Sequence, residues 1–274
     1  MATVLRPLST GELLDRTFSL YRSHFGLFVG IFALPNLCVL AFQCLGLALK
    51  APPAQAFDIS RMLLGAFWGL GALALTLVVT ATSQAATVVA VSEVHLDRPA
   101  GVMDSFSKVK NQIAGVIGLS LSVGFLVGLA CLALIVPGIL LAIRWSLAIP
   151  VKVLEGRSVG DSMSRSTDLT QGNRGRIFVI WLLFLALSIG VSMLLQWPIK
   201  IAAGVGGILA LQQAAPGWHV ASLAATFISQ CLVGPLATIA FSLVYYDERV
   251  RKEAFDLQLM MSTLDAPALQ RAPA

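Results

Sequence analysis

The side chains best suited to chemistry form a triplet in which Glu93, His95 and Asp97 alternate along the chain. Carboxylate and imidazole groups at this spacing on a loop can chelate a divalent cation. On a helix the same spacing spreads them around the axis, and they form only a polar turn after an apolar run. We favour the polar turn, and the chain contains no GxSxG, HExxH or P-loop pattern. The sequence therefore predicts no catalytic residue, no metal site and no cofactor.

Arg144 is a permanent cation inside an apolar run. It lies six residues after Gly138, which is about 9 Å along a helix and close to the expected outer end of its span. Ionisable residues within a span are candidates for function. Two interpretations remain open. Arg144 either snorkels to the interface or pairs structurally, or it binds a lipid phosphate or another anion.

A stripe of hydroxyl side chains follows one face of the second apolar run. Such a stripe either lines a hydrophilic cavity or lets two membrane helices pack closely through small residues. We favour packing. The residues of this candidate polar stripe are Thr76, Thr80, Ser83 and Thr87.

The composition places these residues in a membrane. Hydrophobic residues make up 57% of the 274, charged residues 12%, and the mean hydropathy is +0.83. A soluble domain carries about 25% charged residues. All four cysteines lie in apolar runs without metal-ligand spacing, so we expect small buried side chains.

Six apolar runs are long enough to cross a bilayer, which takes roughly 20 residues. They are Phe25–Leu49, Met62–Ser92, Gln112–Val136, Gly138–Leu154, Ile177–Gln196 and Trp218–Tyr246. We expect a turn at Pro137-Gly138. Ile199–Leu211 remains open as a kinked extension, a re-entrant piece or a short seventh helix. The predicted fold is an all-α integral membrane protein of about six transmembrane helices arranged as three hairpins.

The basic residues predict the orientation, because cytoplasmic loops retain lysine and arginine. With the amino terminus inside, 15 of the 19 basic residues fall on the cytoplasmic side. The others are Lys50, Arg61 and Lys200 outside and Arg144 within a span. We therefore expect a protein of the plasma (inner) membrane with both termini in the cytoplasm.

A polar segment with helical periodicity precedes each odd-numbered span, at Ser9–His24, Pro99–Asn111 and Ser158–Gln171. We interpret these segments as cytoplasmic interfacial amphipathic helices close to anionic lipid. Ordinary amphipathic connectors are the alternative. Ser9 with Glu12 and Ser158 with Asp161 have capping-box spacing. We expect one membrane domain over 1–256, candidate internal repeats at 6–95, 98–155 and 157–248, and a flexible tail over 257–274.

Each even-numbered span ends in an acidic residue, which opposes the helix macrodipole. Bases on or beside the interfacial segments are natural partners for these carboxylates. Solvation of the helix ends is the equally simple alternative. The candidate ion-pair layer consists of Arg16, Glu93, Arg98, Glu155, Arg165 and Asp247.

Three stretches carry a family resemblance: RPLSTGELLDRTFSLYRSHF from Arg6, PGILLAIRWSLAIPVKVLEG from Pro137 and YYDERVRKEAFDLQLM from Tyr245. Together they resemble the bacterial family described as the membrane domain of glycerophosphoryl diester phosphodiesterases, including its stand-alone members. The resemblance implies a multi-helix membrane domain, which in some relatives is attached to a soluble catalytic domain. Because the spans use the whole chain, we expect no catalytic domain of about 250 residues here.

The sequence thus predicts a non-enzymatic multi-pass protein that organises lipid or a partner protein at the cytoplasmic face. The alternative is a transporter or lipid-handling protein with an anion site near Arg144. The expected partners are membrane lipids, anionic at the cytoplasmic face, with a protein partner also open, and no nucleic acid.

Overall fold

The computed structural model describes residues 8–49, 59–96, 98–202 and 216–253. Within these ranges the chain is almost entirely helical and contains no β-strand. The helices are α1 (Thr10–Ser23), α2 (Phe25–Ala48), α3 (Ile59–His95), α4 (Val102–Val109), η1 (Lys110–Gln112), α5 (Ile113–Ala133), α6 (Ile135–Arg144), α7 (Ala148–Glu155), α8 (Val159–Thr170), α9 (Arg174–Ala202) and α10 (Pro216–Glu253).

Six helical segments in the described ranges are long and apolar enough to cross a membrane. They are Phe25–Ala48, Met62–His95, Val102–Ala133, Ile135–Glu155, Arg174–Ala202 and Gly217–Lys252. Each overlaps one predicted run, so the predicted all-α, six-span membrane fold is confirmed. The third segment joins α4, η1 and α5, and the fourth joins α6 and α7 across a break.

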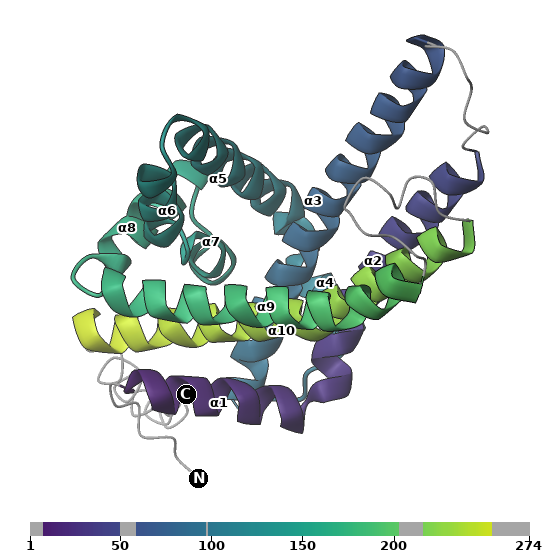
Figure 1. Cartoon of the computed structure of the whole chain (residues 1–274). Coiled ribbons are helices and arrows are strands. Elements are labelled where there is room, and N and C mark those ends of the chain that lie inside the picture. The colour runs from purple at the N-terminus through teal and green to yellow at the C-terminus, as the bar shows by residue number, and fades with distance from the viewer. Residues whose placement is uncertain (1–7, 50–58, 97, 203–215, 254–274) are drawn as a thin grey trace, which may run out of the picture.

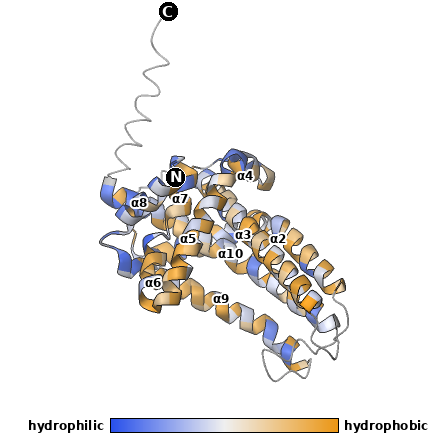
Figure 2. Ribbon diagram, turned by 90° about the horizontal axis from the view of Figure 1, so that it is seen from above, coloured by the Kyte–Doolittle hydropathy of each residue, from blue (hydrophilic) through white to orange (hydrophobic). Residues whose placement is uncertain are grey.

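Helices α9 and α10 pack side by side, and α1 runs beside α10 (Figure 1). Helices α2 and α3 lie toward the right-hand end of this pair, and α5 with α6 toward its left-hand end (Figure 1). Apolar residues cover most of α3, α5 and α6, whereas hydrophilic residues gather at α8 (Figure 2). Side chains such as Phe125 and Leu132 are 70% and 86% exposed. A bilayer supplies the apolar surroundings that such outward-facing side chains need.

The turn between the third and fourth spans lies at Leu134, not at the predicted Pro137-Gly138. Leu134 is extended (φ −157°, ψ 131°), and α6 begins with the next residue. Proline fits the first turn of a helix, where its missing N–H removes no hydrogen bond. Gly138 then lies against α5: a Cβ there would be 2.8 Å from the Cys131 backbone and 2.1 Å from its Sγ. The glycine is needed for close helix contact rather than for a turn.

Part of the open segment Ile199–Leu211 extends α9, which continues past Pro198 to Ala202. The rest of that segment lies outside the described residues, as does the predicted tail over 257–274.

The first predicted amphipathic segment forms α1, and its apolar face packs against protein. Ser9 and Glu12 form the predicted capping box. Leu13 and Thr17 are completely buried, and Leu13 belongs to a core that includes Leu243 and Val244 of α10. The side of α1 expected to enter the headgroup layer is therefore largely covered by α10, and its opposite side faces outward.

Candidate functional site

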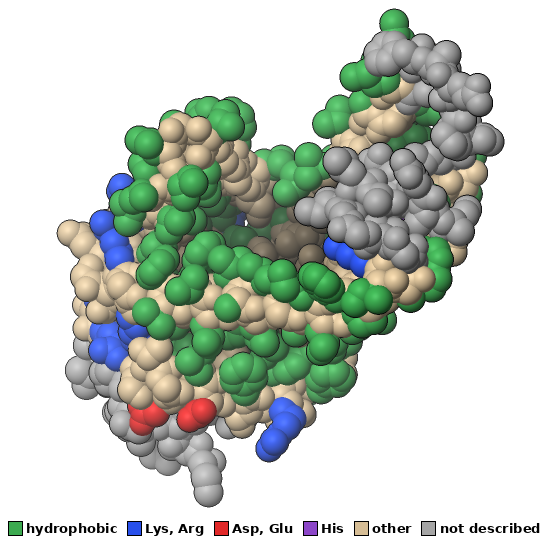
Figure 3. All heavy atoms as spheres, in the orientation of Figure 1, with side chains coloured by type: hydrophobic (Ala, Val, Ile, Leu, Met, Phe, Trp, Pro, Cys, Tyr) green, Lys and Arg blue, Asp and Glu red, His purple; other side chains and the backbone are tan. Residues whose placement is uncertain are grey.

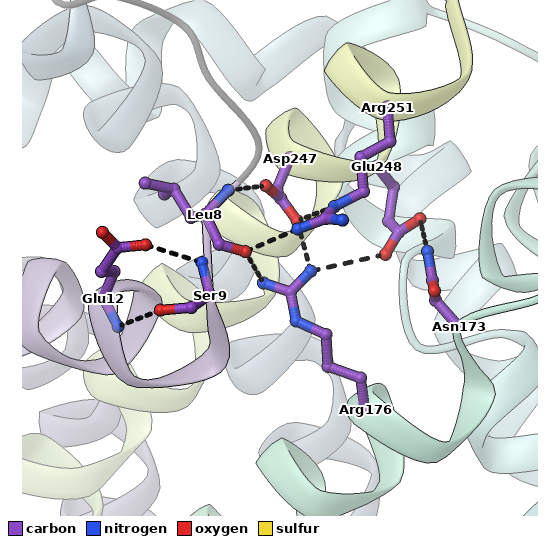
Figure 4. Close-up of polar contacts among 8 residues, drawn as sticks. All are labelled: Leu8, Ser9, Glu12, Asn173, Arg176, Asp247, Glu248 and Arg251. Atoms are coloured by element: carbon purple, nitrogen blue, oxygen red, sulfur yellow. Dashed lines mark hydrogen bonds and ion pairs between the residues drawn. The ribbon is translucent and has the colours of Figure 1, made fainter.

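Asp247, near the end of α10, joins three separate parts of the chain through one carboxylate (Figure 4). Its Oδ1 accepts a hydrogen bond of 2.7 Å from the backbone N–H of Leu8. Its Oδ2 accepts from Nη1 of Arg176 on α9, and from Nε of Arg251 at 2.9 Å. The Asp247 side chain is only 1% exposed. A buried carboxylate with two cationic partners and a backbone donor is well compensated for its desolvation.

The same two arginines also hold the carbonyl of Leu8. Nη2 of Arg176 donates to Leu8 O at 3.0 Å, and Nη2 of Arg251 donates to it at 2.6 Å. Both backbone groups of Leu8 are thus bound by side chains of α9 and α10 (Figure 4). We call Leu8, Arg176, Asp247 and Arg251 the N-terminal clamp, because it fixes the start of α1.

Glu248 extends this cluster to the loop before α9. Its side chain is fully buried, and its Oε2 accepts a 2.8 Å hydrogen bond from Nδ2 of Asn173. Its Oε1 lies 3.9 Å from Nη1 of Arg176, which is an ion-pair contact but too long for a hydrogen bond. The α8–α9 loop is therefore attached to α10 as well.

A second cluster surrounds Glu155 at the end of α7. Its Oε1 accepts a 2.9 Å hydrogen bond from the Tyr245 hydroxyl and lies 3.5 Å from Nε of Arg165. Its Oε2 lies 2.5 Å from Nε of Arg157. The Arg249 guanidinium donates to the Tyr245 hydroxyl at 3.1 Å. Helices α7, α8 and α10 therefore meet at one carboxylate.

The residues of the Glu93, His95 and Asp97 triplet, for which we favour a polar turn, make other contacts. Glu93 pairs with Lys108 at 3.0 Å, and the His95 ring stacks on Tyr246 with centroids 5.3 Å apart. Asp97 lies outside the described residues. Within the part of the chain that the structure describes, no group of three or more potential ligands is arranged to hold a metal ion.

The predicted ion-pair layer is assembled with different partners. Glu155 and Arg165 come together as expected, but Asp247 pairs with Arg176 and Arg251. Arg16 is half-buried on α1 and is not among the described partners of Asp247. Likewise Glu93 pairs with Lys108 on α4, not with Arg98, whose backbone N–H bonds to Glu93 O at 2.9 Å.

Sequence reasoning missed the contributions of Arg176, Asn173 and the Leu8 backbone. Charge counting placed Arg176 at the correct end of its span but gave no reason to choose it over Arg174. The spacing of Asp247 and Arg251, four residues apart on a helix, was a usable signal, because such pairs face each other.

Arg144 lies within the fourth span, Ile135–Glu155, at the break between α6 and α7. It ends α6, and its carbonyl accepts hydrogen bonds from Ser166 at 2.8 Å and Thr170 at 3.4 Å, both on α8. These bonds attach the end of α6 to α8, the helix that also carries Arg165 of the Glu155 cluster. Its Nε is buried and has no hydrogen-bond partner among the described residues.

The hydroxyl stripe on α3 points largely into protein. Ser83 and Thr87 are fully buried, and their hydroxyls have no partner among the described residues. Thr76 donates to Ala72 O of its own helix at 2.7 Å, and Thr80 is half-buried. This arrangement resembles helix packing through small residues more than the wall of an open cavity.

The far end of α1 is also attached to α10. The Tyr21 hydroxyl donates to Leu232 O at 3.0 Å, close to Pro235, where the helix lacks one backbone donor. Burial, and to a lesser degree the Cys231 thiol, raises the pKa of Tyr21 to about 12, so the hydroxyl keeps its proton at physiological pH.

A half-open groove of about 600 Å³ lies on the outward side of α1 and the start of α2. Phe18 and Phe25 in this groove are 43% and 46% exposed. Along the lower edge of the molecule in the space-filling view, where α1 lies, acidic side chains are followed by a basic patch to their right (Figure 3). We call this surface the α1 groove; its residues are Asp15, Phe18, Ser19, Tyr21, Arg22 and Phe25.

Comparison with known families gives one match. A family model described as the membrane domain of glycerophosphoryl diester phosphodiesterase matches residues 113–259, which is more than half of the chain. The matched region contains α5 to α10 and both carboxylate clusters except Leu8 of the N-terminal clamp. Neither the curated proteins nor the solved structures gave a match.

Proposed function

The chain belongs to the family of the membrane domain of glycerophosphoryl diester phosphodiesterase, and we propose that it is a non-enzymatic module that organises lipid or a partner protein at the cytoplasmic face of the plasma membrane. Lipid is the ligand that the surface of α1 favours. The α1 groove is the observation that carries this proposal.

The orientation rests on the distribution of charge. Both carboxylate clusters lie at one end of the long helices, together with Arg157, Arg165, Arg176, Arg249 and Arg251. Basic residues beside spans are retained in the cytoplasm during insertion. In this orientation the N-terminal clamp and the start of α1 face the cytoplasm.

The α1 groove offers apolar and charged groups next to a membrane span. Phe25 is the first residue of the first span, so the groove begins where that span meets the interface. Aromatic rings and basic residues at this level are typical of helices that contact headgroups and the upper acyl chains. Because the clamp and Tyr21 fix both ends of α1, the groove is presented as a preformed surface.

The non-enzymatic part of the proposal is supported by what the carboxylates do. Asp247, Glu155 and Glu93 each pair with a base, and Asp247 and Glu155 also link segments distant in the sequence. General acid–base catalysis needs such groups within reach of a substrate. A phosphodiesterase assay on purified protein with a glycerophosphodiester should give no turnover. Turnover by the wild type that is lost in Glu155→Gln would contradict the non-enzymatic part of the proposal.

Lipid retention tests the proposal directly. Replacing Phe18 and Phe25 together by serine should lower the phospholipid that co-purifies with the protein, because the apolar part of the groove is lost. Phe125→Ser is the matched control, since Phe125 is 70% exposed on α5, far along the chain from the groove. Equal phospholipid content in the double variant and the control would contradict the proposal.

Arg144 supports a second candidate function, a lipid-handling or transport role with an anion site. Its Nε is buried without a partner among the described residues, beside a break in the span. Broken helices are how many transporters expose backbone to a substrate. Arg144→Gln should then reduce the amount of co-purifying anionic lipid. Arg144→Lys should weaken the binding of this lipid, because an ammonium lacks the planar bidentate contact of a guanidinium. Unchanged anionic lipid in Arg144→Gln would remove this candidate.

A further inference from the structure

The charged residues of the α1 groove stand in a fixed order. Asp15, Ser19 and Arg22 are separated by four and three residues and line the same groove. Residues at these spacings share one helix face. The groove therefore presents an anion, a hydroxyl and a cation in line, with Phe18 and Phe25 beside them.

This order suits a zwitterion better than an anion. Arg22 and the Ser19 hydroxyl can donate hydrogen bonds to a phosphate, and guanidinium groups bind phosphate especially well. The side chain of Arg22 leans toward the amino-terminal end of its helix, and so toward Ser19 and Asp15. Asp15 would repel a second negative charge but accept hydrogen bonds from an ammonium group.

We propose that the α1 groove binds the headgroup of a zwitterionic phospholipid with a primary ammonium, with its phosphate at Arg22 and its ammonium at Asp15. This inference rests on the proposed function and names the lipid class for the same surface. It differs from the sequence-based expectation of anionic lipid at the cytoplasmic face. The aromatic rings of Phe18 and Phe25 would contact the glycerol and the first methylenes of the acyl chains.

The test measures which lipids remain bound. The full-length protein is placed in nanodiscs with equal amounts of phosphatidylethanolamine and phosphatidylglycerol, and retained lipids are counted by native mass spectrometry. The wild type should retain phosphatidylethanolamine in preference, by roughly tenfold, the lower end of the factor expected for one charge-assisted hydrogen bond. When phosphatidylcholine replaces phosphatidylethanolamine in the discs, less of the zwitterionic lipid should be retained, because a quaternary ammonium has no N–H to donate to Asp15.

Two variants separate the roles of the two charges. Asp15→Asn should remove the preference for phosphatidylethanolamine while total retained lipid stays the same, and Arg22→Gln should lower retention of both lipids. Asp168→Asn, an exposed aspartate on α8, should change neither quantity. Both groove residues are exposed, so the variants should fold.

Failure of the inference and failure of the proposed function give different results. Lipid retained without preference in the wild type, or a preference that survives Asp15→Asn, overturns the zwitterionic assignment but not the lipid role. No retained lipid in the wild type overturns both.

Discussion

At the scale of single residues, the buried charges act as structural links. Asp247 joins α1, α9 and α10, and Glu155 joins α7, α8 and α10. Breaking a buried ion pair by removing one partner is far more destabilising than the pair is stabilising, because the other charge stays buried. These two carboxylates should therefore be sensitive positions although neither contacts a ligand in this account.

Replacing Asp247 by asparagine tests the N-terminal clamp. The amide can still accept from Leu8, but Arg251 loses its counter-ion and Arg176 keeps only Glu248, at 3.9 Å. We expect a loss of about 3 kcal/mol in the free energy of unfolding, the lower end for such a pair because Arg251 is partly exposed. The free energy of unfolding is measured in mixed micelles from the loss of helicity, and Asp168→Asn is the control variant. Equal stability of the two variants would show that the clamp contributes little.

Gly138 tests the contact between α5 and α6. A methyl group there would overlap the Cys131 backbone, which cannot move aside like a flexible side chain. Gly138→Ala should lower the free energy of unfolding by about 1–3 kcal/mol, the usual effect of overpacking. Gly128→Ala, where no atom lies within 4 Å of the added methyl, should be neutral or slightly stabilising. A neutral Gly138→Ala would mean that the two helices are farther apart.

At the scale of elements, hydrophobic run length predicted the spans well, because lipid forces the backbone to satisfy its own hydrogen bonds in helices. Capping at Ser9 and Ser158 was also readable, since it depends on residues three apart. The break after Arg144 could not be predicted from such local spacing. It depends on α8, whose Ser166 binds backbone groups 19 and 22 residues away. Local patterns carry no information on such contacts, so the break after Arg144 was not predicted.

Ser166 tests how α8 stabilises this break. Its hydroxyl donates to Arg144 O at 2.8 Å and accepts from Leu147 N at 3.2 Å, and the residue is fully buried. Ser166→Ala removes the Ser166 partner of Leu147 N–H and leaves Arg144 O with only the long bond from Thr170, so we expect a loss of about 2 kcal/mol in the free energy of unfolding. Ser164→Ala, on the exposed side of α8, is the control. Hydrogen exchange should also rise in α6 and α7; unchanged exchange there would argue against the contact.

At the scale of the whole molecule, the proposed function requires the carboxylate clusters and the α1 groove to face the cytoplasm. Single cysteines at Gln55 and Ser107, in a background without the four native cysteines, report the two sides of the membrane. An impermeant thiol reagent on intact cells should label only Gln55→Cys. In lysed cells both cysteines should react, which is the control. Labelling of Ser107→Cys in intact cells would show that the orientation is the reverse of the proposed one.

The central claim is that the outward side of α1 contacts lipid. A photoreactive phenylalanine analogue at Phe18, in proteoliposomes, tests it most directly, with Leu132 as a lipid-facing reference and Ser164 as a water-facing one. After irradiation, mass spectrometry should find phospholipid adducts at positions 18 and 132 and none at 164. Lipid adducts at position 132 but only water addition or protein adducts at position 18 would contradict the claim.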